Sequence, residues 1–385
     1  MKVLIIPSWY PTEDNPISGI FFKEQAEALN EYIDVAVLNL NRMTLRNPKN
    51  IFIKKRKDLK YRNDLLTLNK DYIDWFPKIS FLKTKIYKHQ LLKSYNRIIK
   101  EFGKPDIIHA HVSYPAGYGA MLLSEELEIP FIVTEHATFF SEILMGRHKK
   151  FTKKVLDKAE SYVAVSSPLK NKIIEAGRSN CEVIPNFIDF EKFSKSNEPE
   201  IMNNDDKFNL INVSLMTEKK GIIFLLKSLK QLVENFNYKN IHLNLVGDGP
   251  KKNEYKKIAK KLNIMDFCTF YGMVENDKVA NLMNKSKALV ISSKKETFGV
   301  VGIEAMAAGL PVVATICGGP EDYVTSETGL LVERENVNDL SKGIKNLIDN
   351  YQSYDSEVIK KYIKDNFSKE AVTKEYIKLY QKIIS

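Results

Sequence analysis

Short apolar runs rich in β-branched residues alternate along the whole chain with segments whose apolar positions repeat at helical spacing. This alternation is typical of parallel sheets wrapped by helices. In the first half it predicts strands at Lys2–Pro7, Ile33–Leu40, Asp106–Val112, Pro130–His136, Ser161–Ser166 and Cys181–Pro185, with helices such as Phe21–Asn30 and Ser167–Ala176 between them. In the second half it predicts strands at Phe208–Leu215, Ile241–Val246, Phe267–Tyr271, Ala288–Ser292, Pro311–Thr315 and Gly329–Val332.

The polar stretch Ser194–Lys207 interrupts this pattern and has the composition of an interdomain linker. A chain of 385 residues suits two domains, which we place at residues 1–193 and 208–367. The last segment, 368–385, contains an amphipathic helix, Ser368–Ile384, with Ser368 as its N-cap. We expect this helix to pack back onto one of the domains.

Composition favours a soluble globular protein, with 44% hydrophobic and 28% charged residues. The three cysteines, Cys181, Cys268 and Cys317, are far apart and odd in number, which indicates a reduced, cytoplasmic setting. Lys2–Pro7 reads as a first strand and not as a signal peptide. Because no apolar stretch is long enough to cross a bilayer, we expect a soluble protein, or one attached peripherally to a membrane surface.

The net charge of +10 is concentrated between Arg42 and Lys104, where 18 Lys and Arg stand against 5 Asp and Glu. Such a region can attract anionic lipid, and Phe81–Glu101 interleaves lysines with apolar residues. A plain surface helix, whose apolar side lies on the domain core, explains the same segment. A lysine-rich proteome also explains the charge.

In doubly wound sheets, ligands bind where the carboxyl ends of strands lead into helix N-termini. Gly247 and Gly249 follow a predicted strand and let the backbone approach a ligand closely, although a simple tight turn is an equal alternative. Gly318 and Gly319 repeat this pattern after a later strand. Lys219 and Lys220, in the turn after the strand that begins at Phe208, offer charge to a diphosphate or are merely exposed.

The segment from Glu296 to Pro311 carries the strongest signal. A loop with Glu296 and Gly299 leads into a helix from about Val300 to Ala308, which contains Glu304. Gly299 leaves the helix start open to an anion, and carboxylates accept hydrogen bonds from adjacent sugar hydroxyls. The alternative is a capped helix with two solvated glutamates.

These residues resemble glycosyltransferase family 4, the retaining enzymes with the GT-B fold. The most specific match is Glu296-x7-Glu304 in E-T-F-G-V-V-G-I-E-A-M-A-A-G-L-P, followed by Gly318–Gly319. The order V-G-D-G-P, F-Y-G, S-S-x-x-E and C-G-G-P-E is also the family's order. In the first half, Asp106–His111, Thr134–His136 and Ile184–Asp189 look like family segments. The resemblance implies two Rossmann-like doubly wound α/β domains that face each other across a cleft, with the acceptor on the N-terminal side.

The resemblance also implies roles for individual residues. Catalytic roles fall on His136, Glu296 and Lys220, with Glu296 at the donor sugar and Glu304 at the nucleotide ribose. The donor-binding positions implied are Gly19, Gly247, Gly249, Lys219, Lys220, Glu296, Phe298, Gly299, Val300 and Glu304. No metal or other cofactor is expected. Leu215 departs from the family, which has an arginine there paired with the lysine at the diphosphate.

The histidines at strand ends are weighed separately. We interpret His109 as structural and His136 as functional, because His136 ends a strand that leads to the predicted cleft. For His111, on the acceptor side, both readings stay open.

The implied function is transfer of a sugar from a UDP- or GDP-linked donor to a glycan or polyprenyl-linked glycan, in the synthesis of a bacterial cell-surface polysaccharide. Two alternatives remain: a nucleotide-sugar epimerase of the same fold, and a non-catalytic basic protein that binds lipid or nucleic acid. Because no nucleic-acid module is recognisable, nucleic acid is not an expected partner.

Overall fold

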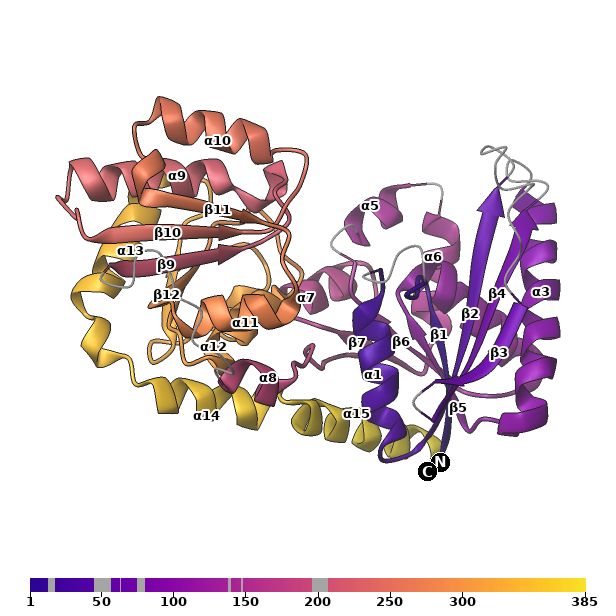
Figure 1. The fold of residues 1–385 in the computed structure, drawn as a ribbon. Coiled ribbons are helices and arrows are strands. Elements are labelled where there is room, and N and C mark those ends of the chain that lie inside the picture. The colour runs from indigo at the N-terminus through magenta and orange to yellow at the C-terminus, as the bar shows by residue number, and fades with distance from the viewer. Residues whose placement is uncertain are drawn as a thin grey trace. The chain divides into compact units, whose positions relative to one another are not determined.

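A computed structural model describes residues 1–12, 18–44, 57–62, 64–74, 80–137, 140–146, 148–195 and 207–385. The chain forms two compact units (Figure 1). The N-terminal unit consists of Met1–Val165, Leu169–Ile184 and Thr373–Ser385. The C-terminal unit consists of Ser166–Pro168 and Pro185–Val372.

The N-terminal unit is built on an eight-stranded sheet in the order β3-β4-β2-β1-β5-β6-β7-β8. Neighbouring strands are parallel except for the pair β3 and β4. Its strands are β1 (Lys2–Pro7), β2 (Asp34–Thr44), β3 (Lys57–Arg62), β4 (Leu65–Asp74), β5 (Ile107–His111), β6 (Phe131–Glu135), β7 (Ser161–Ala164) and β8 (Cys181–Val183). The strand order reverses between β1 and β5, because the chain first adds strands on one side of β1 and then on the other. Doubly wound sheets bind ligands at such a point.

The described helices of this unit are α1 (Ile20–Asn30), α3 (Ser80–Phe102), α4 (Tyr118–Leu127), α5 (Phe140–Met145), α6 (Lys149–Lys158), most of α7 (Ser167–Glu175) and most of α15 (Lys369–Ile384). In α3, Leu91, Tyr95 and Ile98 are buried. The apolar side of this basic helix therefore packs on the core of the N-terminal unit, as the surface-helix alternative predicts. Within the described ranges, no helix has both the length and the apolar character needed to cross a membrane.

The C-terminal unit contains a six-stranded parallel sheet in the order β11-β10-β9-β12-β13-β14. Its strands are β9 (Phe208–Val213), β10 (Ile241–Val246), β11 (Cys268–Gly272), β12 (Ala288–Ile291), β13 (Val312–Thr315) and β14 (Gly329–Val332). All six were predicted to within a few residues. Here the strand order reverses between β9 and β12.

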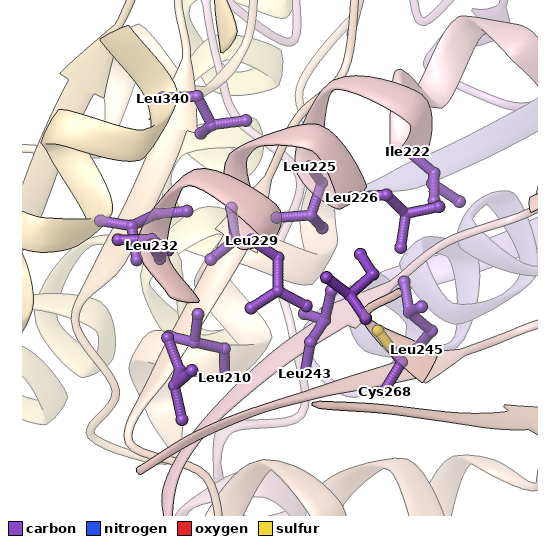
Figure 2. Packing of buried hydrophobic residues seen from close by; sticks show 14 of the residues in the cluster. Leu210, Ile222, Leu225, Leu226, Leu229, Leu232, Leu243, Leu245, Cys268 and Leu340 are labelled. Atoms are coloured by element: carbon purple, nitrogen blue, oxygen red, sulfur yellow. The ribbon is translucent and has the colours of Figure 1, made fainter. Parts of the chain in front are cut away.

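The helices of the C-terminal unit are α8 (Phe190–Ser194), α9 (Ile222–Glu234), α10 (Lys252–Lys261), α11 (Asn276–Asn284), α12 (Val300–Ala307), α13 (Val337–Asp349) and α14 (Ser356–Phe367). Figure 2 shows the core beneath α9, where Leu225, Leu229 and Leu232 lie over Leu210 of β9 and Leu243 of β10. All five side chains are at most 1% exposed. Burial of each leucine stabilises the unit by about 1.5–3 kcal/mol, which fixes the sheet whose carboxyl edge carries the site.

The boundary between the units differs from the predicted one at residue 193. Helix α8 belongs to the C-terminal unit, where the Asn284 Nδ2 donates to the Phe193 carbonyl at 3.0 Å and Lys192 pairs with Asp277 at 2.7 Å. The long segment of the C-terminal unit therefore begins at Pro185. Of the predicted linker, residues 196–206 lie outside the described residues.

Helix α15 begins at Lys369, and the Ser368 hydroxyl accepts a hydrogen bond from the Ala371 N–H at 3.3 Å, as expected of an N-cap. From Thr373 onward the helix belongs to the N-terminal unit. Its Tyr376 and Tyr380 are buried there. The helix packs back onto the N-terminal unit through these two aromatic side chains.

Candidate functional site

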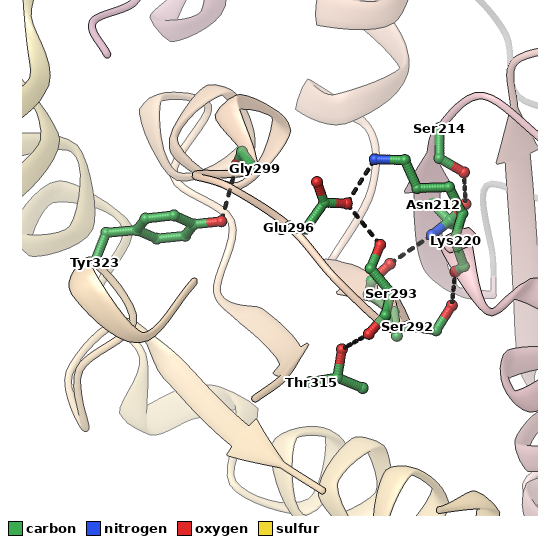
Figure 3. A network of polar contacts seen from close by, with 10 residues as sticks. Asn212, Ser214, Lys220, Ser292, Ser293, Glu296, Gly299, Thr315 and Tyr323 are labelled. Carbon is green, nitrogen blue, oxygen red and sulfur yellow. Dashed lines mark hydrogen bonds and ion pairs between the residues drawn. The ribbon is translucent and has the colours of Figure 1, made fainter. Parts of the chain in front are cut away.

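An ion pair joins the loops that follow β9 and β12, at the point where the strand order of the C-terminal sheet reverses. The Lys220 ammonium lies 2.5 Å from Oε1 of Glu296, and the Ser293 hydroxyl donates to the same oxygen at 2.7 Å (Figure 3). The Glu296 side chain is 9% exposed and that of Lys220 is 23% exposed. Within the described residues, Oε2 of Glu296 accepts no hydrogen bond, so one carboxylate oxygen is left to bind a ligand.

Close backbone packing fixes the lysine side of this pair. Gly221 has φ +61°, and a Cβ there would lie 2.0 Å from the Ser292 carbonyl oxygen. The Ser292 hydroxyl in turn donates to the Lys220 carbonyl at 3.0 Å. Only glycine fits at 221, and the two loops are held together by their backbones.

The glutamate side of the pair rests on the loop after β13. The Glu296 N–H donates to the Cys317 carbonyl at 2.8 Å. A Cβ at Gly318 would lie 2.6 Å from the Glu296 carbonyl oxygen, and one at Gly319 would lie 2.2 Å from that of Phe298. These two glycines therefore have a supporting role in the structure, because they let the β13 loop pass directly behind the Glu296 loop.

Gly299 takes a left-handed conformation, φ +81°, and α12 begins at the next residue, Val300. The Tyr323 hydroxyl donates to the Gly299 carbonyl at 2.9 Å, and Figure 3 shows its ring reaching toward this turn. Glu304 is half-buried on α12. The Phe298 side chain is 2% exposed, so Phe298 can reach a ligand only through its backbone.

Lys219 adds a second cation at the same edge. Its side chain is half-buried, and burial, assisted by Lys220 and Lys295, lowers its pKa, while Glu296 acts in the opposite direction. Its ammonium forms no ion pair with any other described residue. An anion bound here would offset the free-energy cost of burying the charged ammonium. Leu215, where the family has arginine, is 55% exposed and brings no charge.

Gly247 and Gly249 pack against the loop after β9. A Cβ at Gly247 would lie 2.1 Å from the Ser214 carbonyl oxygen, and one at Gly249 would lie 2.6 Å from that of Met216. Both have positive φ. The structure therefore gives them a packing role, which agrees with the tight-turn alternative.

The N-terminal unit gathers its predicted residues around Phe22 of α1. Gly19, with φ +74°, precedes α1, and a Cβ there would lie 2.5 Å from the Trp9 carbonyl oxygen. The Phe22 ring stacks on His111 at 4.7 Å and meets His136 edge-on at 5.0 Å between centroids. Gly19, His111 and His136 therefore lie near one another at the carboxyl edge of this sheet.

Three residues that are not among the predicted site residues hold these sites in place. Ser293 fixes Glu296 and Tyr323 fixes the Gly299 turn. Glu135, fully buried on β6, accepts hydrogen bonds from the N–H groups of His136 at 3.0 Å and Ala137 at 2.9 Å. Burial raises the pKa of Glu135, and these hydrogen bonds act against that rise. Among the residues that the structure describes, no group of three or more His, Cys, Asp or Glu side chains is arranged to hold a metal ion.

Two family models together match most of the chain. The model for Glycosyltransferase Family 4 matches residues 54–192, and the model for Glycosyl transferases group 1 matches residues 194–366. The chain belongs to glycosyltransferase family 4. It is accordingly an enzyme of the hexosyltransferase type, with two Rossmann-like domains of the GT-B fold.

Relatives of this glycosyltransferase occur in archaea and bacteria. An uncharacterized glycosyltransferase of Methanocaldococcus jannaschii is 33% identical over 252 residues, which cover 64% of this chain and 66% of that protein. The putative teichuronic acid biosynthesis glycosyltransferase TuaC of Bacillus subtilis is 25% identical over 361 residues, 89% of this chain and 88% of that protein.

The fold matches solved structures over nearly the full chain. Anabaena HepE in complex with UDP superimposes with a TM-score of 0.74 at 17% identity and covers 99% of this chain and 100% of that one. The lipopolysaccharide outer core galactosyltransferase WaaB, in its apo form, gives a TM-score of 0.73 at 17% identity, again over 99% of this chain and 100% of that one.

Proposed function

We propose that this glycosyltransferase moves a sugar from a nucleoside diphosphate donor to a hydroxyl of a glycan or polyprenyl-linked glycan, with retention of the anomeric configuration. The observation that carries the proposal is Glu296, whose carboxylate is held by Lys220 and Ser293 through one oxygen while the other remains available. A carboxylate fixed in this way can accept hydrogen bonds from the hydroxyls of a donor sugar.

The neighbouring residues suit the rest of such a donor. Glu304, one turn into α12, would bind ribose hydroxyls. The backbone N–H groups of Gly299 and Val300 lie at the start of α12 and would donate hydrogen bonds to phosphate oxygens. The helix dipole would add to this attraction. Lys219 and Lys220 would supply the positive charge, so that no metal ion takes part in this scheme.

In the proposed reaction, the bond between the anomeric carbon and the diphosphate oxygen breaks as a bond forms from the acceptor oxygen on the same face. The acceptor hydroxyl loses its proton to the departing diphosphate. The transition state resembles an oxocarbenium ion, and charge develops on the leaving phosphate, where the two lysines and the start of α12 would stabilise it.

Named relatives support a donor and a pathway. HepE has been solved with UDP, with UDP and glucose, and with UDP-glucose. TuaC is named for teichuronic acid biosynthesis, and WaaB for the lipopolysaccharide outer core. We therefore propose a UDP- or GDP-linked donor and a role, at the cytoplasmic side of the cell membrane, in making a cell-surface polysaccharide.

The donor is tested by thermal unfolding with UDP, GDP, ADP and their common sugar conjugates, because a ligand that binds only the folded state raises Tm. We expect one base to raise Tm and Glu304→Ala to abolish the shift. Glu327→Ala is the matched control, since exposed Glu327 precedes β14 at the opposite edge of the sheet. No shift with any nucleotide would contradict the donor assignment, and an NMR time course showing an inverted product would contradict retention.

We also propose that the basic region from Arg42 to Lys104 brings the enzyme to an anionic lipid surface. With Leu91, Tyr95 and Ile98 in the core, its attraction would come mainly from lysine and arginine side chains. Binding to phosphatidylglycerol vesicles should then disappear at high salt, whereas neutral vesicles should not bind at any salt. Failure to co-sediment with anionic vesicles at low salt would remove this proposal.

A further inference from the structure

Three imidazoles form one continuous cluster at the carboxyl ends of β5 and β6. His109 and His111 lie on the same face of β5, with ring centroids 4.4 Å apart. His136 follows β6, and its ring centroid is 5.3 Å from that of His111. His111 is fully buried between the other two, so its hydrogen bonds are the ones that decide the protonation pattern of the cluster.

His109 lies at one end of the cluster, and both of its ring nitrogens have hydrogen-bond partners. Its Nδ1 lies 2.7 Å from the Tyr380 hydroxyl of α15, and its Nε2 lies 2.7 Å from the Thr134 hydroxyl of β6. Burial lowers the pKa of His109 to about 3, so it is neutral at physiological pH. With both nitrogens occupied, His109 offers no hydrogen bond to His111.

Among the described residues, the His111 side chain has one hydrogen-bond partner. Its Nδ1 lies 3.2 Å from Nε2 of His136, whereas its own Nε2 is buried without a hydrogen-bond partner. Burial lowers the pKa of His111 well below the usual range, so the ring is neutral and carries a single N–H. A buried N–H without an acceptor is costlier than a bare nitrogen, and the proton therefore belongs on Nδ1, where it has an acceptor.

We propose that His111 is a positioning residue, which donates its Nδ1–H to Nε2 of His136 and thereby fixes His136 in the tautomer that carries hydrogen on Nδ1. The tautomer of a histidine is set by the hydrogen bond that its other nitrogen makes. A proton added to Nε2 of His136 would face the His111 N–H, unless His111 moved its own proton to its orphaned, buried Nε2.

As a consequence, His136 would act at the site as a hydrogen-bond donor. His136 presents an N–H from Nδ1 and cannot take up a proton through Nε2 while that nitrogen is occupied. In the proposed retaining reaction the acceptor proton goes to the departing diphosphate, so a histidine that only donates is what the chemistry asks for. The inference rests on the proposed function only in giving His136 a place in the reaction.

The backbone around His136 is held as firmly as its ring. Oε1 of Glu135 accepts the N–H groups of His136 and Ala137, while Oε2 accepts the N–H of Ser113, in the segment after β5, at 3.0 Å. This carboxylate ties the ends of β5 and β6 together. The distance between His111 and His136 is thus set by the strands and not by two loose side chains.

The test is the protonation site of His136, read from two-bond ¹⁵N–¹H correlation spectra of the full chain labelled with ¹⁵N-histidine. The six histidines are separated by assignment variants, and His136→Gln removes the signals of His136. We expect a protonated Nδ1 and a bare Nε2 in His136, and the same pattern in His111. A protonated Nε2 on His136 in the unmodified protein would overturn the proposal without any variant at His111.

Two substitutions at 111 separate positioning from packing. His111→Asn keeps an amide donor that can reach Nε2 of His136 and should preserve the Nδ1–H form. His111→Phe fills the space without a donor, and the Nε2–H form of His136 should then appear. An unchanged His136 spectrum in His111→Phe would show that His111 does not set the tautomer. Nucleotide-induced Tm shifts, which probe the C-terminal unit, report separately on the proposed donor site.

Discussion

The ammonium of Lys220 and the carboxylate of Glu296, 76 residues apart in sequence, meet at 2.5 Å across the point where the C-terminal sheet reverses its strand order. In the absence of a ligand, each group neutralises the other. A nucleoside diphosphate sugar would bring a diphosphate for Lys220 and sugar hydroxyls for Oε2 of Glu296, so donor binding would add two contacts with the ligand while the ion pair through Oε1 holds Glu296 in place.

The first prediction follows from this pair. Glu296→Gln keeps the shape of the side chain but removes the charge that accepts sugar hydroxyls, and we expect kcat/KM to fall by about 10²-fold or more. Binding of the free nucleoside diphosphate, measured by calorimetry, should change much less than binding of the sugar conjugate. If both ligands weaken equally, Glu296 does not contact the sugar.

Gly221→Ala should destabilise the C-terminal unit and disrupt the site. The new Cβ would lie 2.0 Å from the Ser292 backbone, and we expect a loss of roughly 2 kcal/mol or more, together with weaker nucleotide binding. Gly177→Ala is the matched control, because Gly177 also has positive φ but has open space around its Cβ position. Backbone strain alone should cost the control about 1 kcal/mol, as urea unfolding would show. Equal losses of stability in the two variants would mean that small shifts of neighbouring atoms relieve the close contact at little cost in free energy.

His109 makes the N-terminal unit sensitive to acid. Its pKa is about 3 in the folded protein and about 6.5 when unfolded, so only the unfolded state takes up this proton between these values. Stability therefore falls as the pH drops from 6.5 toward 3, by about 1.4 kcal/mol per pH unit for this group. His109→Gln should flatten the slope. Tryptophan fluorescence is a suitable readout, because the ring of Trp9 lies 5.3 Å from that of Phe22 in the N-terminal unit. An unchanged slope would contradict the assignment.

The cysteines should be unreactive while the protein is folded. Burial raises the pKa of Cys181 to about 11 and those of Cys268 and Cys317 to about 12, and the thiolate is the reactive form. We expect a disulfide reagent at pH 8 to label no thiol of the native protein within minutes, and all three after unfolding in guanidinium. Rapid labelling of Cys317 in the native state would show that the loop beside Glu296 opens readily.

Much of the C-terminal unit could be predicted from sequence because its strands are short β-branched runs that end at loops rich in glycine. The strands β3 and β4 were missed, since Lys57–Arg62 and Leu65–Asp74 carry many charged and amide side chains. Partners distant in sequence make those residues acceptable in a sheet: the Asn39 amide donates to Asn69 at 2.9 Å, and the Lys70 ammonium lies 3.2 Å from the Ser94 hydroxyl.

The same reasoning applies to the site. Glu296, Lys220 and Gly299 lie in local motifs, so the family resemblance could propose them as site residues before the structure placed them at one edge of the sheet. Tyr323 acts on Gly299 from 24 residues away, and nothing in the intervening sequence announces that contact. For the glycines at 247 and 249, ligand contact and a tight turn were both open from sequence, and the ligand-binding pattern was extended to 318 and 319. The structure adds a close approach of neighbouring backbone at all four positions, which single-sequence reasoning cannot predict.

The N-terminal unit is formed by residues from both ends of the sequence, and in sequence most of the C-terminal unit comes between them. During synthesis, the imidazole of His109 leaves the ribosome 271 residues before its partner Tyr380. Until then the face of β5 that carries His109 and His111 lacks Tyr376 and Tyr380 as a cover. The C-terminal unit must therefore be synthesised before the histidine cluster receives this cover.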